Sequence, residues 1–81
     1  MFVKYNDKKQ STYIDSYQIG DDYIDIIFKK EPNTVYHYSY LKPGEFEVEC
    51  MKAAALNRSG FTGYLDTHCR YFFEYKTKIK R

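Results

Sequence analysis

Three tyrosines alternate along one short segment of the chain, at Tyr36, Tyr38 and Tyr40. In a β-strand, alternate side chains point to the same face and lie about 7 Å apart. If exposed, such a row of rings could stack unpaired nucleobases, as the sheets that read single-stranded RNA do. The same spacing fits a strand whose rings form the sheet's half of the hydrophobic core, because Val35 and His37 make a more polar competing face. The sequence leaves both interpretations open.

The last part of the chain could supply contacts to phosphate groups. Residues 1–69 carry eight Lys or Arg against ten Asp or Glu, whereas residues 70–81 carry five basic residues against Glu74 alone. A basic end of this kind is either a solvated terminus or a site for a phosphate backbone or an acidic partner. The candidate phosphate-binding residues are Arg70, Lys76, Lys78, Lys80 and Arg81.

Arg70 and Tyr64 form a second candidate site. A guanidinium group can bind a phosphate through two parallel hydrogen bonds while a neighbouring ring stacks on a base. The alternative is structural, because Arg70 could instead tie its loop to Asp66 or to carbonyl groups at a helix end.

Catalytic and metal-binding patterns are weak in this chain. With 81 residues it can form one domain with a modest core, so an enzyme with a deep cleft is not expected. His37, Cys50, His68 and Cys69 lack the spaced pairs typical of zinc sites, and no metal or cofactor is predicted. A nucleophile at Cys69 or Ser59, with His68 and Asp66, has no better support, because adjacency in sequence is not the geometry that a base and nucleophile need.

Hydrophobic periodicity predicts the elements that must position these residues. Ile24, Ile26 and Phe28 alternate within a strand over residues 23–29, which follows another strand over residues 12–19 through a turn at residues 20–22. Further strands are expected over residues 34–40 and 70–76, and an edge strand over residues 2–5. The predicted fold is α+β: an antiparallel β-meander of three to five strands with one main helix packed on one face.

The main helix is expected over residues 43–56, because Pro43 suits a first helical turn and the following Glu residues favour the positive end of the dipole. The pattern predicts that it turns Phe46, Cys50, Ala53 and Ala54 towards the sheet, with Met51 and Leu56 on the borders of that face. A short second helix is expected within residues 61–69, capped by Thr62 or Ser59.

The order of these elements resembles the KTSC domain, a family named after an extension at the C-terminus of some lysyl-tRNA synthetases. The matching positions, within about residues 11–75, are Ser11, Ile14, Phe28, Tyr36, Tyr38, Pro43, Tyr64, Leu65 and Arg70. The segment from Ser59 to Gly63 looks like the family's Ser-x-Gly element with an insertion, so no role is carried over to Ser59. The resemblance implies a domain over residues 11–75 between an N-terminal segment, 1–10, and a basic tail, 76–81. The family has no established activity, only a suggestion of RNA binding.

Two functions are therefore predicted. The first is a small non-enzymatic RNA-binding accessory that stacks bases on Tyr36, Tyr38 and Tyr64 and holds phosphates with Arg70 and the basic tail. The alternative is a phage- or mobile-element-encoded protein that binds and inhibits a host protein, because a fifth of the chain is aromatic and some rings must lie at the surface. Homodimerisation through a sheet edge fits either function.

The chain contains no apolar run long enough to span a bilayer, and its first residues lack a signal-peptide core. A cytoplasmic protein with no membrane partner is expected, in which Cys50 and Cys69 stay free thiols.

Overall fold

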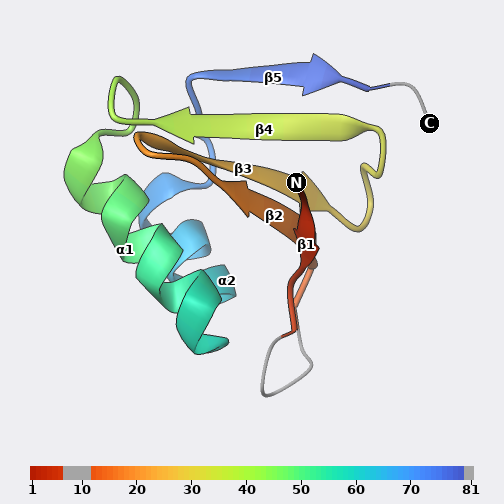
Figure 1. The fold of residues 1–81 in the computed structure, drawn as a ribbon, viewed down its shortest axis with the longest axis horizontal. Coiled ribbons are helices and arrows are strands. Elements are labelled where there is room, and N and C mark those ends of the chain that lie inside the picture. The colour runs from red at the N-terminus through yellow and green to blue at the C-terminus, as the bar shows by residue number, and fades with distance from the viewer. Residues whose placement is uncertain (7–11, 80–81) are drawn as a thin grey trace.

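The computed structural model describes residues 1–6 and 12–79. The predicted opening residue Ser11 and the basic residues Lys80 and Arg81 lie outside these ranges. The described residues form a five-stranded sheet, one main helix and a second short helical segment, which confirms the predicted α+β fold (Figure 1). The elements are β1 (Val3–Lys4), β2 (Ile14–Ile19), β3 (Tyr23–Phe28), β4 (Thr34–Ser39), α1 (Glu45–Asn57), α2 (Phe61–Tyr64), the π-helical turn η1 (Leu65–Cys69) and β5 (Tyr75–Lys78).

The strands form an antiparallel meander in the order β1-β2-β3-β4-β5. The Gly20 amide donates to the Tyr23 carbonyl at 3.0 Å and closes the predicted β2–β3 turn. The Thr34 amide donates to the Glu31 carbonyl at 3.1 Å in the β3–β4 turn. The predicted edge strand at the N-terminus is present as β1, which pairs with β2. Turn residues and alternation thus set the topology that the sequence indicates.

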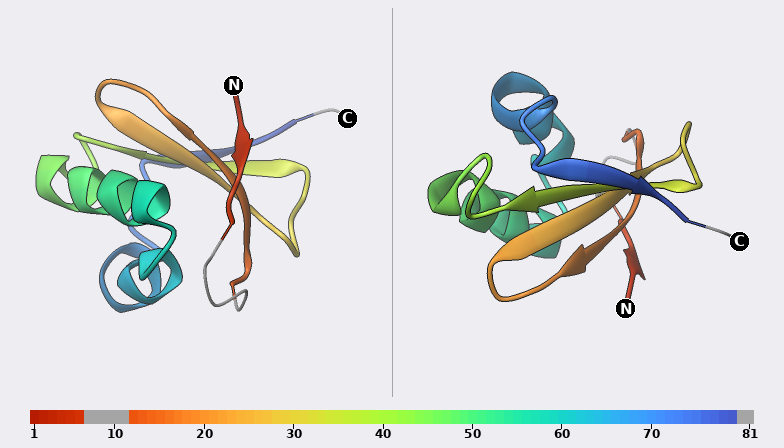
Figure 2. Two further views of the ribbon diagram at one scale, coloured as in Figure 1. Left: turned by 60° about the horizontal axis from the view of Figure 1, so that its bottom comes forward. Right: turned by 90° about the horizontal axis from the view of Figure 1, so that it is seen from above.

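Both helical segments cover the same face of the sheet (Figure 2). The core lies between that face and the helices. It consists of the side chains on one side of β3 and β4, together with side chains from α1, α2 and η1. Tyr38 is fully buried and Tyr36 is 8% exposed. The interpretation of the tyrosine row as the sheet's half of the core therefore holds. The main members of this core are Ile24, Ile26, Phe28, Tyr36, Tyr38, Val48, Met51, Ala55, Phe61 and Leu65.

The predicted start and inner face of the main helix were wrong. Pro43 lies in a turn before the helix, where the Ser39 carbonyl accepts hydrogen bonds from the amides of Lys42 (3.0 Å) and Gly44 (3.1 Å). Gly44, at φ 123°, is the residue that caps α1, a conformation that glycine adopts without strain. Because α1 follows this turn, it buries Val48, Met51, Lys52 and Ala55.

The residues predicted to face the sheet lie on the other side of α1. Phe46 is 71% exposed, Ala53 is exposed, and Cys50 and Ala54 are half-buried. Both faces of this helix are apolar at helical spacing, so periodicity could not distinguish them.

The last strand begins later than predicted. Residues 70–74 cross from the helices back to the sheet, and Phe73 packs edge-on against Tyr36 with ring centroids 4.9 Å apart. The Tyr38 hydroxyl donates to the Arg70 carbonyl at 3.0 Å. The strand then continues to Lys78, and the Ile79 amide still donates to the Asn33 carbonyl at 2.7 Å. Lys76 and Lys78 therefore belong to a paired strand with exposed side chains, and not to an unpaired tail.

The second helical segment spans 61–69, as predicted, but Gly60 caps its start without a side-chain hydrogen bond from Thr62 or Ser59. Within the described residues, no helix has the length and apolar character needed to cross a membrane.

Candidate nucleic-acid interface

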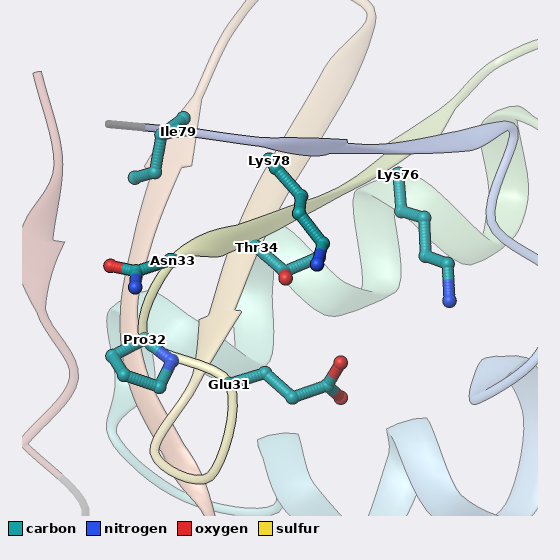
Figure 3. Close-up of a pocket in the computed structure, with 7 residues that line it drawn as sticks. All are labelled: Glu31, Pro32, Asn33, Thr34, Lys76, Lys78 and Ile79. Atoms are coloured by element: carbon teal, nitrogen blue, oxygen red, sulfur yellow. The ribbon is translucent and has the colours of Figure 1, made fainter. Parts of the chain in front are cut away.

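Strand β5 separates its side chains between the two faces of the sheet. Lys76 and Lys78 pair with Tyr36 and Thr34 of β4, and residues opposite each other in an antiparallel pair share a face. Both lysines therefore lie on the face that carries the helices, and the Lys76 ammonium is 5.7 Å from the centroid of the Tyr36 ring. Figure 3 shows the two side chains extending from β5 towards Glu31 and Thr34. Two cations therefore lie side by side on β5, opposite Tyr36 and Thr34 of β4.

A hollow of about 660 Å³ lies beneath these lysines. The β3–β4 turn forms its other wall (Figure 3). A second hollow, of about 180 Å³, adjoins it because Glu31 and Lys76 line both. We call the two hollows together the basic depression. Its lining residues are Phe28, Glu31, Pro32, Asn33, Thr34, Tyr36, Arg70, Tyr71, Phe73, Lys76, Lys78 and Ile79.

Glu31 is the carboxylate inside the basic depression. Its two oxygens accept hydrogen bonds from the Tyr36 hydroxyl at 3.0 and 2.9 Å. Burial, followed by this hydrogen bond, raises the pKa of Tyr36 above its ordinary value. The tyrosine thus holds Glu31 in place and withdraws part of its hydrogen-bonding capacity from the depression.

Arg70 lies at the other end of the basic depression. Its guanidinium carbon is 4.6 Å from the centroid of the Tyr13 ring, and Nη1 is 3.4 Å from Oδ1 of Asp66. The Tyr13 hydroxyl donates to the same carboxylate oxygen, and burial together with this bond raises the pKa of Tyr13 to about 12. The structural alternative for Arg70 is therefore confirmed, because the residue is tied to Asp66. Its side chain is still 37% exposed and has further donors for an anion.

The predicted pairing of Arg70 with Tyr64 was wrong. The Tyr64 ring packs on His68, with centroids 4.5 Å apart, and burial and a hydrogen bond with the Cys50 side chain raise the pKa of Tyr64. Besides Tyr13, the rings near Arg70 include the 78% exposed Tyr71, whose centroid lies 5.7 Å from the guanidinium carbon. The sequence signal for Tyr71 was its position directly after Arg70, but the alternation of residues 70–76 had assigned it to a strand.

Tyr36 and Tyr38 cannot form the predicted stacking platform. Stacking on a base requires an exposed ring face, whereas these rings lie beneath the helices and Phe73. Burial also raises the pKa of Tyr38 well above its ordinary value. Of the predicted site residues, Arg70, Lys76 and Lys78 all line the basic depression. Tyr36 forms part of its wall, and Tyr38 lies in the core.

On the opposite face of the sheet, His37 lies between two carboxylates and two tyrosine rings. His37 stacks on Tyr75 with centroids 4.5 Å apart, and its Nδ1 is 2.5 Å from Oδ1 of Asp25. Its Nε2 is 3.7 Å from Oε1 of Glu74, and the Tyr23 ring lies 5.0 Å from the imidazole. Because two carboxylates flank the imidazole, this face disfavours a phosphate backbone.

The His and Cys residues that were weighed as metal ligands or nucleophiles can now be placed. In the described part of the chain, no group of three or more His, Cys, Asp or Glu is arranged to hold a metal ion. Cys69 is fully buried, and burial raises the pKa of its thiol to about 11, so the thiol is protonated near neutral pH. Comparison with known proteins gave no matching family model, no matching curated protein and no matching solved structure.

Proposed function

We propose that this protein is a non-catalytic module that binds single-stranded nucleic acid, RNA above all, in the basic depression beside β5. The observation that carries the proposal is the placement of Lys76 and Lys78 on one side of a paired strand, next to Arg70 and the exposed Tyr71 ring. The resemblance to the KTSC domain supports the same class of ligand, and membership of that family stays a prediction.

The geometry of β5 suits an extended phosphate backbone. Two residues apart on a strand, Lys76 and Lys78 are separated by about 7 Å along the chain, which is comparable to the spacing of neighbouring phosphates in an extended strand. Within the described residues, neither lysine forms an ion pair with a carboxylate. Their charges are therefore available to displace counterions from a nucleic acid.

Tyr71 supplies the contact to a base. Its ring is exposed beside Arg70, so a base stacked there would leave its phosphate within reach of the guanidinium and of Lys76. Base–aromatic stacking contributes about 1–3 kcal/mol and tolerates any base. Binding is therefore expected to depend strongly on salt and weakly on sequence.

The test is a titration of labelled single-stranded RNA of about 12 nucleotides, followed by fluorescence anisotropy at several salt concentrations. The double variant Lys76→Glu and Lys78→Glu is compared with the control Lys4→Glu and Lys42→Glu, two exposed lysines outside the basic depression. Both doubles change the net charge equally. We expect the β5 double to lower affinity at least about tenfold more than the control. Equal losses, or no RNA binding by the unchanged protein at low salt, would refute the proposal.

A further inference from the structure

Thr34, the first residue of β4, presents an unpartnered hydroxyl to the larger hollow of the basic depression. The residue is only 8% exposed and belongs to the lining of the hollow of about 660 Å³. Among the residues that the structure describes, none forms a hydrogen bond with this hydroxyl. Every fully enclosed polar side-chain atom in the same part of the chain does have a partner. The Thr34 hydroxyl is therefore open to the hollow alone.

A nearly buried hydroxyl without a partner is unusual, because buried polar groups normally form hydrogen bonds. The backbone of Thr34 is already used, since its amide donates to the Glu31 carbonyl at 3.1 Å in the β3–β4 turn. The hydroxyl has lost most of its water and gains nothing from the fold in return. A ligand atom that accepts its proton would restore the missing hydrogen bond.

The two lysines of β5 lie on the same side as this hydroxyl. Thr34 is directly opposite Lys78 in the register of β4 and β5, and such residues share a face with Cβ atoms about 5 Å apart. Figure 3 shows both side chains at the hollow, with Lys76 further along β5. One hydroxyl and two ammonium groups are donors of the kind that phosphate oxygens accept from.

The walls that carry these donors are fixed by backbone hydrogen bonds. The Ile79 amide donates to the Asn33 carbonyl at 2.7 Å, which ties the end of β5 to the β3–β4 turn. The side chains of Asn33 and Ile79 also line the hollow. Because the strand and the turn are already joined, an anion can bind without the cost of ordering either segment.

Glu31 limits the charge that the hollow can accept. It lines the same hollow, and both of its oxygens accept from the Tyr36 hydroxyl. Together with Lys76 and Lys78, its carboxylate leaves one net positive charge. A phosphodiester in a nucleic-acid backbone carries one negative charge, so the charge balance favours this form of phosphate over the more highly charged terminal group.

We propose that the hollow is a subsite for one phosphate group, in which the Thr34 hydroxyl donates to a phosphate oxygen beside Lys78. The inference rests on the proposed function, since it assigns one phosphate of the bound nucleic acid to a place within the basic depression. Thr34 is then a ligand-binding residue without charge. It contributes to affinity and leaves the salt dependence of binding to the lysines.

The first test compares Thr34→Val with the unchanged chain by anisotropy titration of a labelled single-stranded RNA that ends in a 5′-hydroxyl. Val keeps the shape of Thr and removes the donor, so affinity is expected to fall about fivefold. The slope of log K against log salt is expected to stay the same, because no charge is lost. The control is Thr77→Val, an exposed Thr of β5 that pairs with Val35 on the other face. Equal affinities for Thr34→Val and the unchanged chain would overturn the proposal.

A second variant separates the hydroxyl from the shape of the side chain. Thr34→Ser keeps the donor and removes the methyl group, and it is expected to bind RNA within about twofold of the unchanged chain. Urea denaturation should show no loss of stability for Thr34→Val, because the hydroxyl has no partner to lose within the described fold. A loss of affinity in Thr34→Ser as large as in Thr34→Val would assign the effect to packing and contradict the proposal.

The source of the phosphate is distinguished by repeating the titration with the same RNA carrying a 5′-phosphate. Equal losses in Thr34→Val for both RNAs would place a backbone phosphodiester in the subsite. A loss confined to the phosphorylated RNA would place the terminal phosphate there. RNA that binds tightly but is insensitive to Thr34→Val overturns this inference alone, whereas no binding of either RNA by the unchanged chain refutes the proposed function and this inference with it.

Discussion

The two ends of the sheet carry opposite charges, and they differ in how those charges are compensated. At the end formed by the β2–β3 turn and the start of α1, Lys52 donates to the Asp21 carbonyl at 2.9 Å and pairs with Glu49 at 2.8 Å. The Tyr40 hydroxyl also donates to Glu49 at 2.6 Å, and the hydrogen bond from Lys52 leads in holding the pKa of Glu49 below its usual value. Lys52 and Glu49, two central charges of this acidic end, are therefore paired within the fold.

The basic end, formed by the β3–β4 turn and β5, is arranged differently. Lys29, Lys30, Lys76 and Lys78 are exposed, and within the described ranges none of them forms an ion pair. Glu31, a carboxylate that lines the same hollow as Lys76 and Lys78, accepts from the Tyr36 hydroxyl. Charges that are paired internally stabilise a fold, whereas unpaired charges of one sign attract an external partner. This contrast supports the proposal that nucleic acid binds at the basic end.

The largest effect is expected from removing the buried cation at the acidic end. Lys52→Ala deletes two hydrogen bonds of a charged group whose side chain is only 11% exposed, so the free energy of unfolding should fall by about 2–3 kcal/mol. Urea denaturation measures it, with Lys42→Ala as the exposed control that should stay within about 0.5 kcal/mol. RNA affinity should be unchanged at temperatures where the variant is folded. A loss below about 0.5 kcal/mol for Lys52→Ala would remove the contrast between the two ends.

The next largest effect concerns single cations at the basic end. Lys76→Ala and Lys78→Ala should each lower RNA affinity about three- to tenfold at low salt, with little change in stability. Each should also reduce the slope of log K against log salt by about 0.7, the value for one phosphate contact on a single strand. Unchanged slopes would show that the lysines do not contact phosphate.

A smaller effect of opposite sign is expected at Glu31. Glu31→Gln removes a negative charge from the basic depression and keeps an oxygen that can accept from the Tyr36 hydroxyl. RNA affinity should rise about two- to threefold, which anisotropy titration measures against Glu45→Gln, a charge-matched change at the acidic end. A fall in affinity for Glu31→Gln would instead make Glu31 a direct ligand.

The smallest effect is a pH dependence at Tyr13. In the folded state burial and the Asp66 hydrogen bond raise its pKa from 10.0 to about 12, so folding favours the neutral phenol. The stability from this group is complete below pH 10 and is lost as the pH rises through about 12. Denaturation curves across this range should show a smaller decline for Tyr13→Phe than for the unchanged chain. Identical declines would assign the alkaline loss to other groups.

The sequence was sufficient for the meander and insufficient for the site, for identifiable reasons. Strong alternation at Ile24, Ile26 and Phe28 and the turn residues around Gly20 determine topology locally. Helix α1 is different, because Phe46, Cys50 and Ala53 match helical spacing as well as Val48, Met51 and Ala55 do. Which of the two sets is buried depends on the turn at Gly44 that precedes the helix, a tertiary feature without a periodic signal.

The geometry of the candidate site likewise depends on a contact between residues far apart in the sequence. Residues 70–76 show the alternation of a strand, but Phe73 packs in the core against Tyr36, and β5 begins only at Tyr75. This shift exposes Tyr71 and aligns Lys76 with Lys78 on the helix-bearing face. The basic residues of the site were predictable from composition, whereas the exposed Tyr71 ring beside Arg70 was not.

The central claim, that nucleic acid binds at the basic end, is tested most directly by a ¹⁵N–¹H correlation spectrum of the labelled protein titrated with unlabelled single-stranded RNA. We expect shift changes at Arg70, Tyr71, Lys76, Lys78 and the β3–β4 turn, with Asp21, Asp22 and the start of α1 unchanged. Shifts concentrated at the acidic end or on the His37 face, or none at low salt, would contradict it.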